Sequence, residues 1–310
     1  MTQPPPPPPT VQLDALLPAE MATRAEEIGA RKAAMDFTSM FVLAVLAGAF
    51  IALGAVFATS VSAGAGGVLP YGLVRLLAGL VFSLGLILVI VGGAELFTGN
   101  NLIVMAWGHG KVTTVQLVRN WGIVYLGNFV GAMGTVALVF ASGHHTMGDG
   151  AVGMAALGTA ALKVRFTFFE AVALGILCNA LVCLAVWLTL SARTTTDKIL
   201  AIVFPITAFV AAGFEHSIAN MYFVPAGLLV KAGASTEFWL AAGTSAAAFG
   251  ELTWSAFLWR NLLPVTIGNI IGGSLLVGAV YRVVYLRGAA PRPVRPGASA
   301  PPAGARGGAS

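Results

Sequence analysis

The chain has 310 residues, of which 57% are hydrophobic and only 9% are charged, and its formal net charge is +5. Soluble domains carry about 25% charged residues, so this composition excludes a soluble globular protein and predicts an all-α integral membrane protein. The basic residues lie mainly at the ends of apolar segments, where they indicate membrane topology, and we expect no nucleic-acid surface.

The two ends of the chain differ from its middle. Consecutive prolines at residues 4–9 predict a disordered or polyproline tail. Over residues 13–34, apolar and charged side chains are interspersed in a way that predicts an amphipathic helix on the membrane surface. We therefore divide the chain into a tail with this helix (1–35), a transmembrane domain (36–288) and a disordered Pro-, Gly- and Arg-rich tail (289–310).

Four uninterrupted apolar segments are long enough to cross a bilayer once, since about 20 helical residues span its hydrocarbon core. In chain order they are residues 37–60, 118–142, 166–190 and 262–285. Residues 143–165, which carry histidines and charges, are expected to form a loop. Residues 231–260 are too mixed to span, and we expect a loop or a short helix there.

Two further apolar segments, residues 71–107 and 199–230, are interrupted by polar residues. Each interruption has the pattern Gly-x-Glu-x-x-x-x-Asn, running from Gly93 to Asn100 and from Gly213 to Asn220. An acidic side chain at bilayer depth costs about 2.5–3.5 kcal/mol, and broken backbone is not tolerated against lipid. We therefore predict two broken helices whose breaks are buried in protein and lie on a substrate path.

The recurring pattern predicts an internal repeat. The third span carries Gly127-Asn128-Phe129-Val130-Gly131 and the sixth carries Gly268-Asn269-Ile270-Ile271-Gly272. Three spans in each half require the second half to be inverted, and paired broken helices in inverted repeats are typical of a transport pathway at the membrane midplane. An alternating count of Lys and Arg places both termini in the cytoplasm.

These residues resemble the formate/nitrite transporter family, a group of channels for small monovalent anions. The similarity covers roughly residues 20–288 and is carried by four motifs, at 95–99, 175–187, 215–221 and 261–269. The resemblance implies an aquaporin-like six-helix protomer, a homopentamer with one pore in each protomer, and a multi-pass protein of the bacterial inner (plasma) membrane.

The resemblance also implies a pore, position by position. The periplasmic constriction would be formed by Phe82, Leu86 and Phe209, and the cytoplasmic one by Leu96, Phe97 and Val182. Thr98, Asn179 and His216 would face the chamber between them, and Lys163 would lie in the outer vestibule.

The polar residues of the breaks allow more than one interpretation. Glu95 and Glu215 could carry protons, but a structural role at the breaks is favoured, together with Gly99, Asn100 and Asn220. His216 is the side chain that could exchange a proton near neutral pH, and its ordinary alternative is a satisfied core histidine. Lys163 could concentrate anions electrostatically or be an ordinary surface lysine.

We expect the chain to transport small monovalent anions, formate first, with a proton or as the neutral acid. Water and His216 both remain possible proton sources, and nitrite, hydrosulfide, acetate and lactate remain alternative substrates. An intramembrane hydrolase using Ser217 and His216 is less favoured, because adjacent helical residues do not face each other. No enzyme activity, cofactor or metal is expected, and the expected partners are the anion, protons, the lipid bilayer and other copies of the chain.

Overall fold

The computed structural model describes residues 15–287, and every regular element within that range is a helix. Six helices are long and apolar enough to cross a membrane, which confirms the predicted class. Five of them are α2 (Phe37–Ser62), α3 (Tyr71–Gly92), α5 (Thr114–Ala141), α7 (Phe168–Ser191) and α8 (Thr195–Ala212). The sixth runs without interruption from Trp254 to Tyr285 and includes α11 (Trp254–Ala256), α12 (Leu263–Ile270) and α13 (Val280–Tyr285).

Short polar residues fix where these helices begin. The Asp36 side chain accepts a hydrogen bond from Ser39 N at 3.0 Å, so α2 starts at Phe37. Thr113 caps α5 in the same way by accepting from Gln116 N at 3.2 Å. Because this cap lies upstream of the apolar run, α5 starts at Thr114, earlier than the predicted residue 118.

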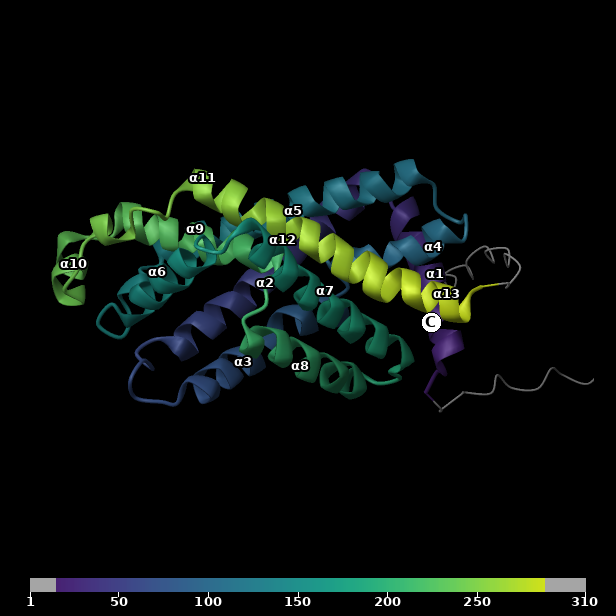
Figure 1. The fold of residues 1–310 in the computed structure, drawn as a ribbon, viewed down its shortest axis with the longest axis horizontal. Coiled ribbons are helices and arrows are strands. Elements are labelled where there is room, and N and C mark those ends of the chain that lie inside the picture. Colours follow the sequence, from purple (N-terminus) through teal and green to yellow (C-terminus); the bar gives the residue numbers. More distant parts are fainter. Residues whose placement is uncertain (1–14, 288–310) are drawn as a thin grey trace, which may run out of the picture.

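The helices run roughly along one axis, and the molecule has two distinct ends (Figure 1). One end carries α1 (Pro18–Ala34), α4 (Val104–Gly108) and α13 (Val280–Tyr285), and the opposite end carries α6 (Ala151–Lys163) and α10 (Thr236–Ala242). The first and the last described helices therefore lie at the same end. The predicted disordered tails fall mainly on residues 1–14 and 288–310, which lie outside the described residues.

Both predicted broken segments are divided at the polar motif. α3 ends at Gly92 and α8 ends at Ala212, and in each case the next residue is a glycine with φ of 79°. This left-handed conformation suits glycine, which explains why each helix stops there. The chain resumes helically with a 3-10 turn at Gly99–Ile103 that leads into α4, and with α9 (Ser217–Gly233) after the second break.

The prediction of a loop at residues 143–165 was wrong. The short helix expected as one alternative within residues 231–260 is present as α10, but the last helix starts earlier than predicted. Residues 143–165 contain α6, whose apolar side chains Val152 and Leu157 are buried against the rest of the molecule. At 13 residues α6 is too short to span, and it lies between histidines and charges, so its apolar pattern was read as part of a loop. In the segment 231–260 the last helix already begins at Trp254, ahead of the predicted residue 262.

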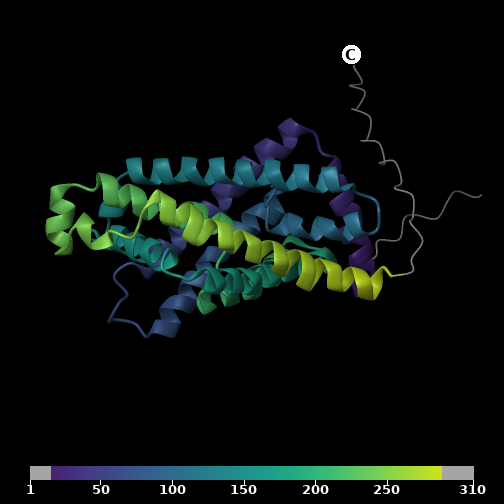
Figure 2. The ribbon, with the colours of Figure 1, turned by 45° about the horizontal axis from the view of Figure 1, so that its top comes forward.

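The last helix contains two wide, π-helical stretches, at Phe257–Leu262 and Ile271–Ala279. The first lies directly before Pro264, which has no N–H to donate and whose ring crowds the preceding turn. This helix and α5 both run along the length of the molecule (Figure 2), and the hydroxyls of Tyr125 and Thr266 join them at 2.8 Å.

Glycines allow the membrane helices to approach closely. A Cβ added at Gly131 of α5 would overlap the carbonyl oxygen of Val45 in α2. A Cβ added at Gly272 would overlap the carbonyl oxygen of Ile176 in α7 in the same manner. The backbones therefore touch at these two positions, as small residues permit in membrane proteins.

Candidate functional site

The two helix breaks meet in the interior of the protein. The Thr98 hydroxyl, from the first break, lies 3.0 Å from Nε2 of His216, in the second break, and both residues are buried. His216 is also the N-cap of α9, because its Nδ1 accepts a hydrogen bond from Ala219 N at 3.0 Å. Since Nδ1 is an acceptor, the neutral ring carries its hydrogen on Nε2 and donates it to Thr98. The Thr98 hydroxyl hydrogen then remains available to donate to a ligand.

Ser217 does not take part in this contact. Both ring nitrogens of His216 have other partners, Thr98 and Ala219, so neither is positioned to activate the Ser217 hydroxyl. This arrangement removes the geometric basis for a serine hydrolase.

Asn179 of α7 holds the first break in place. Its side-chain amide donates to the Thr98 carbonyl oxygen at 3.3 Å, to Asn101 Oδ1 at 3.0 Å and to the Asn269 carbonyl oxygen at 2.7 Å. The thiol of Cys183, one turn further along α7, lies 3.3 Å from the same Thr98 carbonyl. The Asn179 NH₂ group is therefore occupied by protein acceptors, and the position facing the chamber that the resemblance implies for this residue stays a prediction.

A buried ion pair anchors the first break. The Lys32 ammonium of α1 lies 2.9 Å from Glu95 Oε1 and 2.8 Å from Asn100 Oδ1. The Asn100 amide in turn donates to Glu95 Oε2 at 2.7 Å and to Asn120 Oδ1 at 3.0 Å. A buried carboxylate is tolerated when it is paired and its remaining lone pairs are hydrogen-bonded, and Glu95 meets both conditions.

The second break repeats this arrangement with α6 in place of α1. The Lys163 ammonium lies 2.7 Å from Glu215 Oε1, and the Asn220 amide donates to Glu215 Oε2 at 2.7 Å. Asn220 also donates to Asn261 Oδ1 at 2.8 Å, and Asn261 donates back to the Lys163 carbonyl at 2.8 Å. Glu95 and Glu215, Asn100 and Asn220, and the two lysines thus occupy matching places.

Asn128 of α5 ties the first break to α2, and Asn269 of the last helix ties the second break to α7. Asn128 donates to the carbonyls of Ala44 and Glu95, at 2.7 and 2.9 Å. Asn269 donates to the carbonyls of Gly175 and Glu215, at 2.8 and 2.9 Å. These amides satisfy the backbone groups that the breaks leave free.

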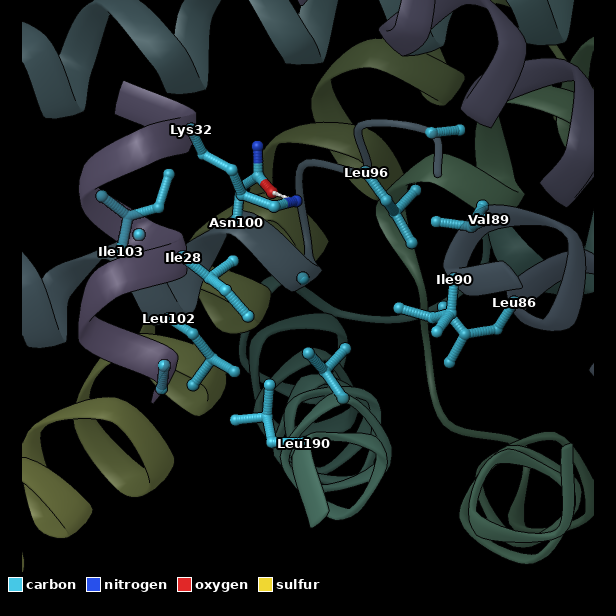
Figure 3. Close-up of a pocket in the computed structure, with 15 residues that line it drawn as sticks. Ile28, Lys32, Leu86, Val89, Ile90, Leu96, Asn100, Leu102, Ile103 and Leu190 are labelled. Carbon is cyan, nitrogen blue, oxygen red and sulfur yellow. Dashed lines mark hydrogen bonds between the residues drawn. The ribbon is translucent and has the colours of Figure 1, made fainter. Parts of the chain in front are cut away.

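Two hollows approach the Thr98–His216 contact from opposite ends of the molecule. The first, which we call the α6-side hollow, has a volume of about 360 Å³, and Phe82, Phe209, Lys163 and His216 are among the residues that line it. The second, the α1-side hollow, has a volume of about 50 Å³ and opens beside Lys32 and Asn100. In Figure 3 the Lys32 and Asn100 side chains meet on one side of it, joined by their hydrogen bond, and Leu86 and Leu96 lie on the other side. Gly99 also lines the α1-side hollow. A Cβ added at Gly99 would lie 3.6 Å from Cγ2 of Val186 in α7.

All six residues predicted to form constrictions are buried, but they do not share one environment. The rings of Phe82 and Phe209 meet edge to face with centroids 5.7 Å apart at the inner limit of the α6-side hollow. The Phe97 ring packs against the Tyr125 ring of α5, with ring centroids 4.9 Å apart. Phe97 is not among the residues that line either of the two hollows. Val182 likewise lines neither of these two hollows.

Sequence reasoning missed four residues of this site. Lys32 was counted only as a topology signal, and Asn120, Asn261 and Arg75 were given no place in it. Arg75 of α3 lines the α6-side hollow and donates from its guanidinium to the carbonyls of Val210 and Ala211. The recurrence of an Asn near the end of each half was the available signal for Asn120 and Asn261.

Comparison with known proteins agrees with this architecture. Residues 19–283 match the model of the family described as "Formate/nitrite transporter". The chain is 50% identical to the formate channel FocA of Escherichia coli K12 over 274 residues, which covers 88% of this chain and 96% of the relative. It is 43% identical to the formate channel FocA of Haemophilus influenzae over 268 residues, 86% and 94% of the two chains.

Among solved structures, the fold is similar to one named "Pentameric formate channel with formate bound". The TM-score is 0.77 at 44% identity, and the match covers 81% of this chain and 98% of that chain. The family match spans most of the described residues, including both breaks and the helices that carry their asparagines. On these grounds the chain belongs to the formate/nitrite transporter family.

Proposed function

We propose that the chain is a formate channel that works as a homopentamer, with one pathway through each protomer. The observation that carries this proposal is the hydrogen bond between Thr98 and His216, which joins two helix breaks between two hollows that open at opposite ends. The formate channels to which the chain is similar give the substrate.

The proposed architecture is aquaporin-like, with two inverted repeats. Its support is the matched set of contacts around Glu95 and Glu215, in which α1 and α6 supply equivalent lysines from opposite ends of the molecule. The repeat unit then begins with the short helix: α1 to α5 form the first unit and α6 to α13 the second. We place α1 and both termini in the cytoplasm of a bacterial cell and α6 on the periplasmic face of its inner membrane.

The pathway that we propose begins in the α6-side hollow, which holds Lys163, and passes the aromatic pair of Phe82 and Phe209. The anion then accepts a hydrogen bond from the Thr98 hydroxyl, whose oxygen accepts from Nε2 of His216. It leaves into the α1-side hollow past Leu96 and past Leu86, which the resemblance had assigned to the periplasmic constriction. The carboxylates Glu95 and Glu215 stay paired throughout, together with Asn100 and Asn220, and hold the breaks open.

A proton accompanies the anion in this proposal. A bare carboxylate loses its hydration between apolar side chains at a cost of several kcal/mol or more, and the neutral acid avoids most of that cost. For His216 to act as the donor it must first take a second proton on Nδ1, and this would break its bond with Ala219 N. The geometry therefore favours water or the bulk solution as the source of the proton.

The test is uptake of labelled formate by proteoliposomes that contain the purified protein. Saturable uptake that is absent from empty liposomes supports the proposal, and competition with unlabelled nitrite, acetate, lactate and hydrosulfide ranks the alternatives. If nitrite is taken up and formate is not, the substrate assignment is wrong. If no small anion is transported, the proposed function fails as a whole.

A further inference from the structure

The charges that line the α6-side hollow are not balanced. Three ionised side chains line it: Arg75, Lys163 and Glu215. Lys163 and Glu215 form an ion pair at 2.7 Å, so from a distance their charges largely cancel. Arg75 has no carboxylate partner among residues 15–287, and its hydrogen-bond acceptors there are the neutral carbonyls of Val210 and Ala211. The unpaired positive charge of this hollow therefore belongs to Arg75.

The α1-side hollow has no equivalent charge. The charged side chain that lines it is Lys32, which is paired with Glu95 at 2.9 Å. Arg75 precedes Gly93 by 18 residues, and the residue that precedes Gly213 by the same interval is Thr195. Arg75 therefore has no charged counterpart in the second half, and this difference gives only the α6-side hollow an unpaired positive charge.

Arg75 also covers a negative helix end. Its Nε donates to the Ala211 carbonyl at 3.3 Å and its Nη2 donates to the Val210 carbonyl, at the C-terminus of α8. The carbonyl end of a helix carries about half a negative charge, and here it faces a hollow that an anion would have to enter. The guanidinium neutralises this end, and its Nη1 keeps two N–H groups without a protein acceptor among the described residues.

We propose that Arg75 is the anion-capture residue of the α6-side hollow, and that Lys163 serves mainly to neutralise Glu215. The charge of Arg75 raises the concentration of small carboxylates at the entrance, and its free N–H groups suit a carboxylate oxygen. This inference rests on the proposed function, because it requires a small anion as the substrate.

The experiment compares Arg75→Gln, Arg75→Lys and the wild type in proteoliposomes, by initial rates of formate uptake against concentration. Removing the charge should raise the half-saturation concentration about threefold to fivefold at low ionic strength, and the difference should shrink at high salt. Arg75→Lys keeps the charge and should stay close to the wild type. Arg260→Gln is the control, because Arg260 is exposed and paired with Glu251 outside this hollow.

Two results would overturn the inference. The proposal requires the half-saturation concentration of Arg75→Gln to exceed that of the wild type at low salt. Equal half-saturation concentrations therefore refute it. Equal, salt-independent losses in Arg75→Lys and Arg75→Gln would make the residue a structural cap of α8 only. The same series measured with nitrite separates this inference from the proposed function. If the wild type transports nitrite but not formate, the formate assignment is refuted and the nitrite series still tests Arg75. If it transports neither anion, both proposals are refuted.

Discussion

His216 is the residue on which the chemistry of the pathway depends. Its two ring nitrogens have different partners, a backbone N–H on one side and the Thr98 hydroxyl on the other. A side chain held in this way works as a fixed hydrogen-bond donor. This assignment makes a pH measurement informative, since a fixed donor and a proton carrier predict different profiles.

We predict that His216→Asn keeps the acid stimulation of formate uptake but lowers the rate. Asparagine is a good N-cap and can still donate a hydrogen bond toward Thr98, so the break stays formed. His216→Phe removes both the cap and the donor, and we expect a loss of about tenfold in rate, since a hydrogen bond contributes about 0.5–1.5 kcal/mol. Stopped-flow uptake from about pH 5 to 8, around the imidazole range, measures both variants. A flat pH profile in His216→Asn alone would show that His216 supplies the proton.

The ion pair of Lys163 and Glu215 gives a second prediction at this scale. Lys163→Ala leaves a buried carboxylate without its partner, and we expect a loss of about 3–5 kcal/mol in the free energy of unfolding, with weaker formate uptake at low concentration. Adding Glu215→Gln removes the stranded charge, so the double variant should recover most of both losses. Thermal unfolding in detergent and uptake assays measure this cycle. Additive losses in the double variant would contradict it.

The residues of the breaks could be predicted, but their partners could not. Gly-x-Glu-x-x-x-x-Asn identified Glu95, Asn100 and their counterparts, because all of its members lie close together along the chain and each Glu is bonded by the Asn of its own motif. Lys32 and Asn120 reach Glu95 and Asn100 from other helices. The interval from lysine to glutamate is 63 residues in the first half and 52 in the second, so a fixed spacing does not reveal Lys32. Asn120 does recur at a fixed spacing, because it precedes Asn128 by eight residues just as Asn261 precedes Asn269.

At the scale of the helix, composition predicted the long spans and missed the short helix α6. A span is recognised by about 20 apolar residues, whereas α6 has 13 and ends at Lys163. The start of the last helix was missed for a related reason: Arg260 and Asn261 interrupt its apolar run, although Asn261 is buried against Asn220 and Lys163. Polar residues that find partners inside the protein are indistinguishable, in sequence, from loop residues.

The contact between α2 and α5 gives a prediction for a helix pair. Gly131→Ala places a methyl group against the Val45 carbonyl, a backbone atom that cannot move aside, and we expect destabilisation of about 1–3 kcal/mol or more. Gly134→Ala, on the same helix, meets open space within 4 Å and is the matched control. Thermal unfolding of the two variants in detergent measures the difference. Equal stability would mean that the two helices are not in backbone contact.

At the scale of the whole molecule, we predict five copies in the assembled protein. The support is the similarity to the pentameric formate channel over 81% of this chain. Large apolar side chains on the outer face of the last helix, such as Trp259 and Leu275, are exposed in a single copy and must meet lipid or another copy. Light scattering in detergent should give a protein mass of five times 31.7 kDa. A mass of one or three copies would refute the pentamer.

The matched ion pairs have a consequence for how the chain is made. Lys32, Glu95, Asn100 and Asn120 all come from the first half of the sequence, and Lys163, Glu215, Asn220 and Asn261 all come from the second. The ribosome therefore delivers every partner of Glu95 before it begins α6. Neither carboxylate has to wait in the bilayer for a partner from the other half, and only the contacts that cross the halves, such as those of Asn179 with Thr98 and Asn101, form when the second half arrives.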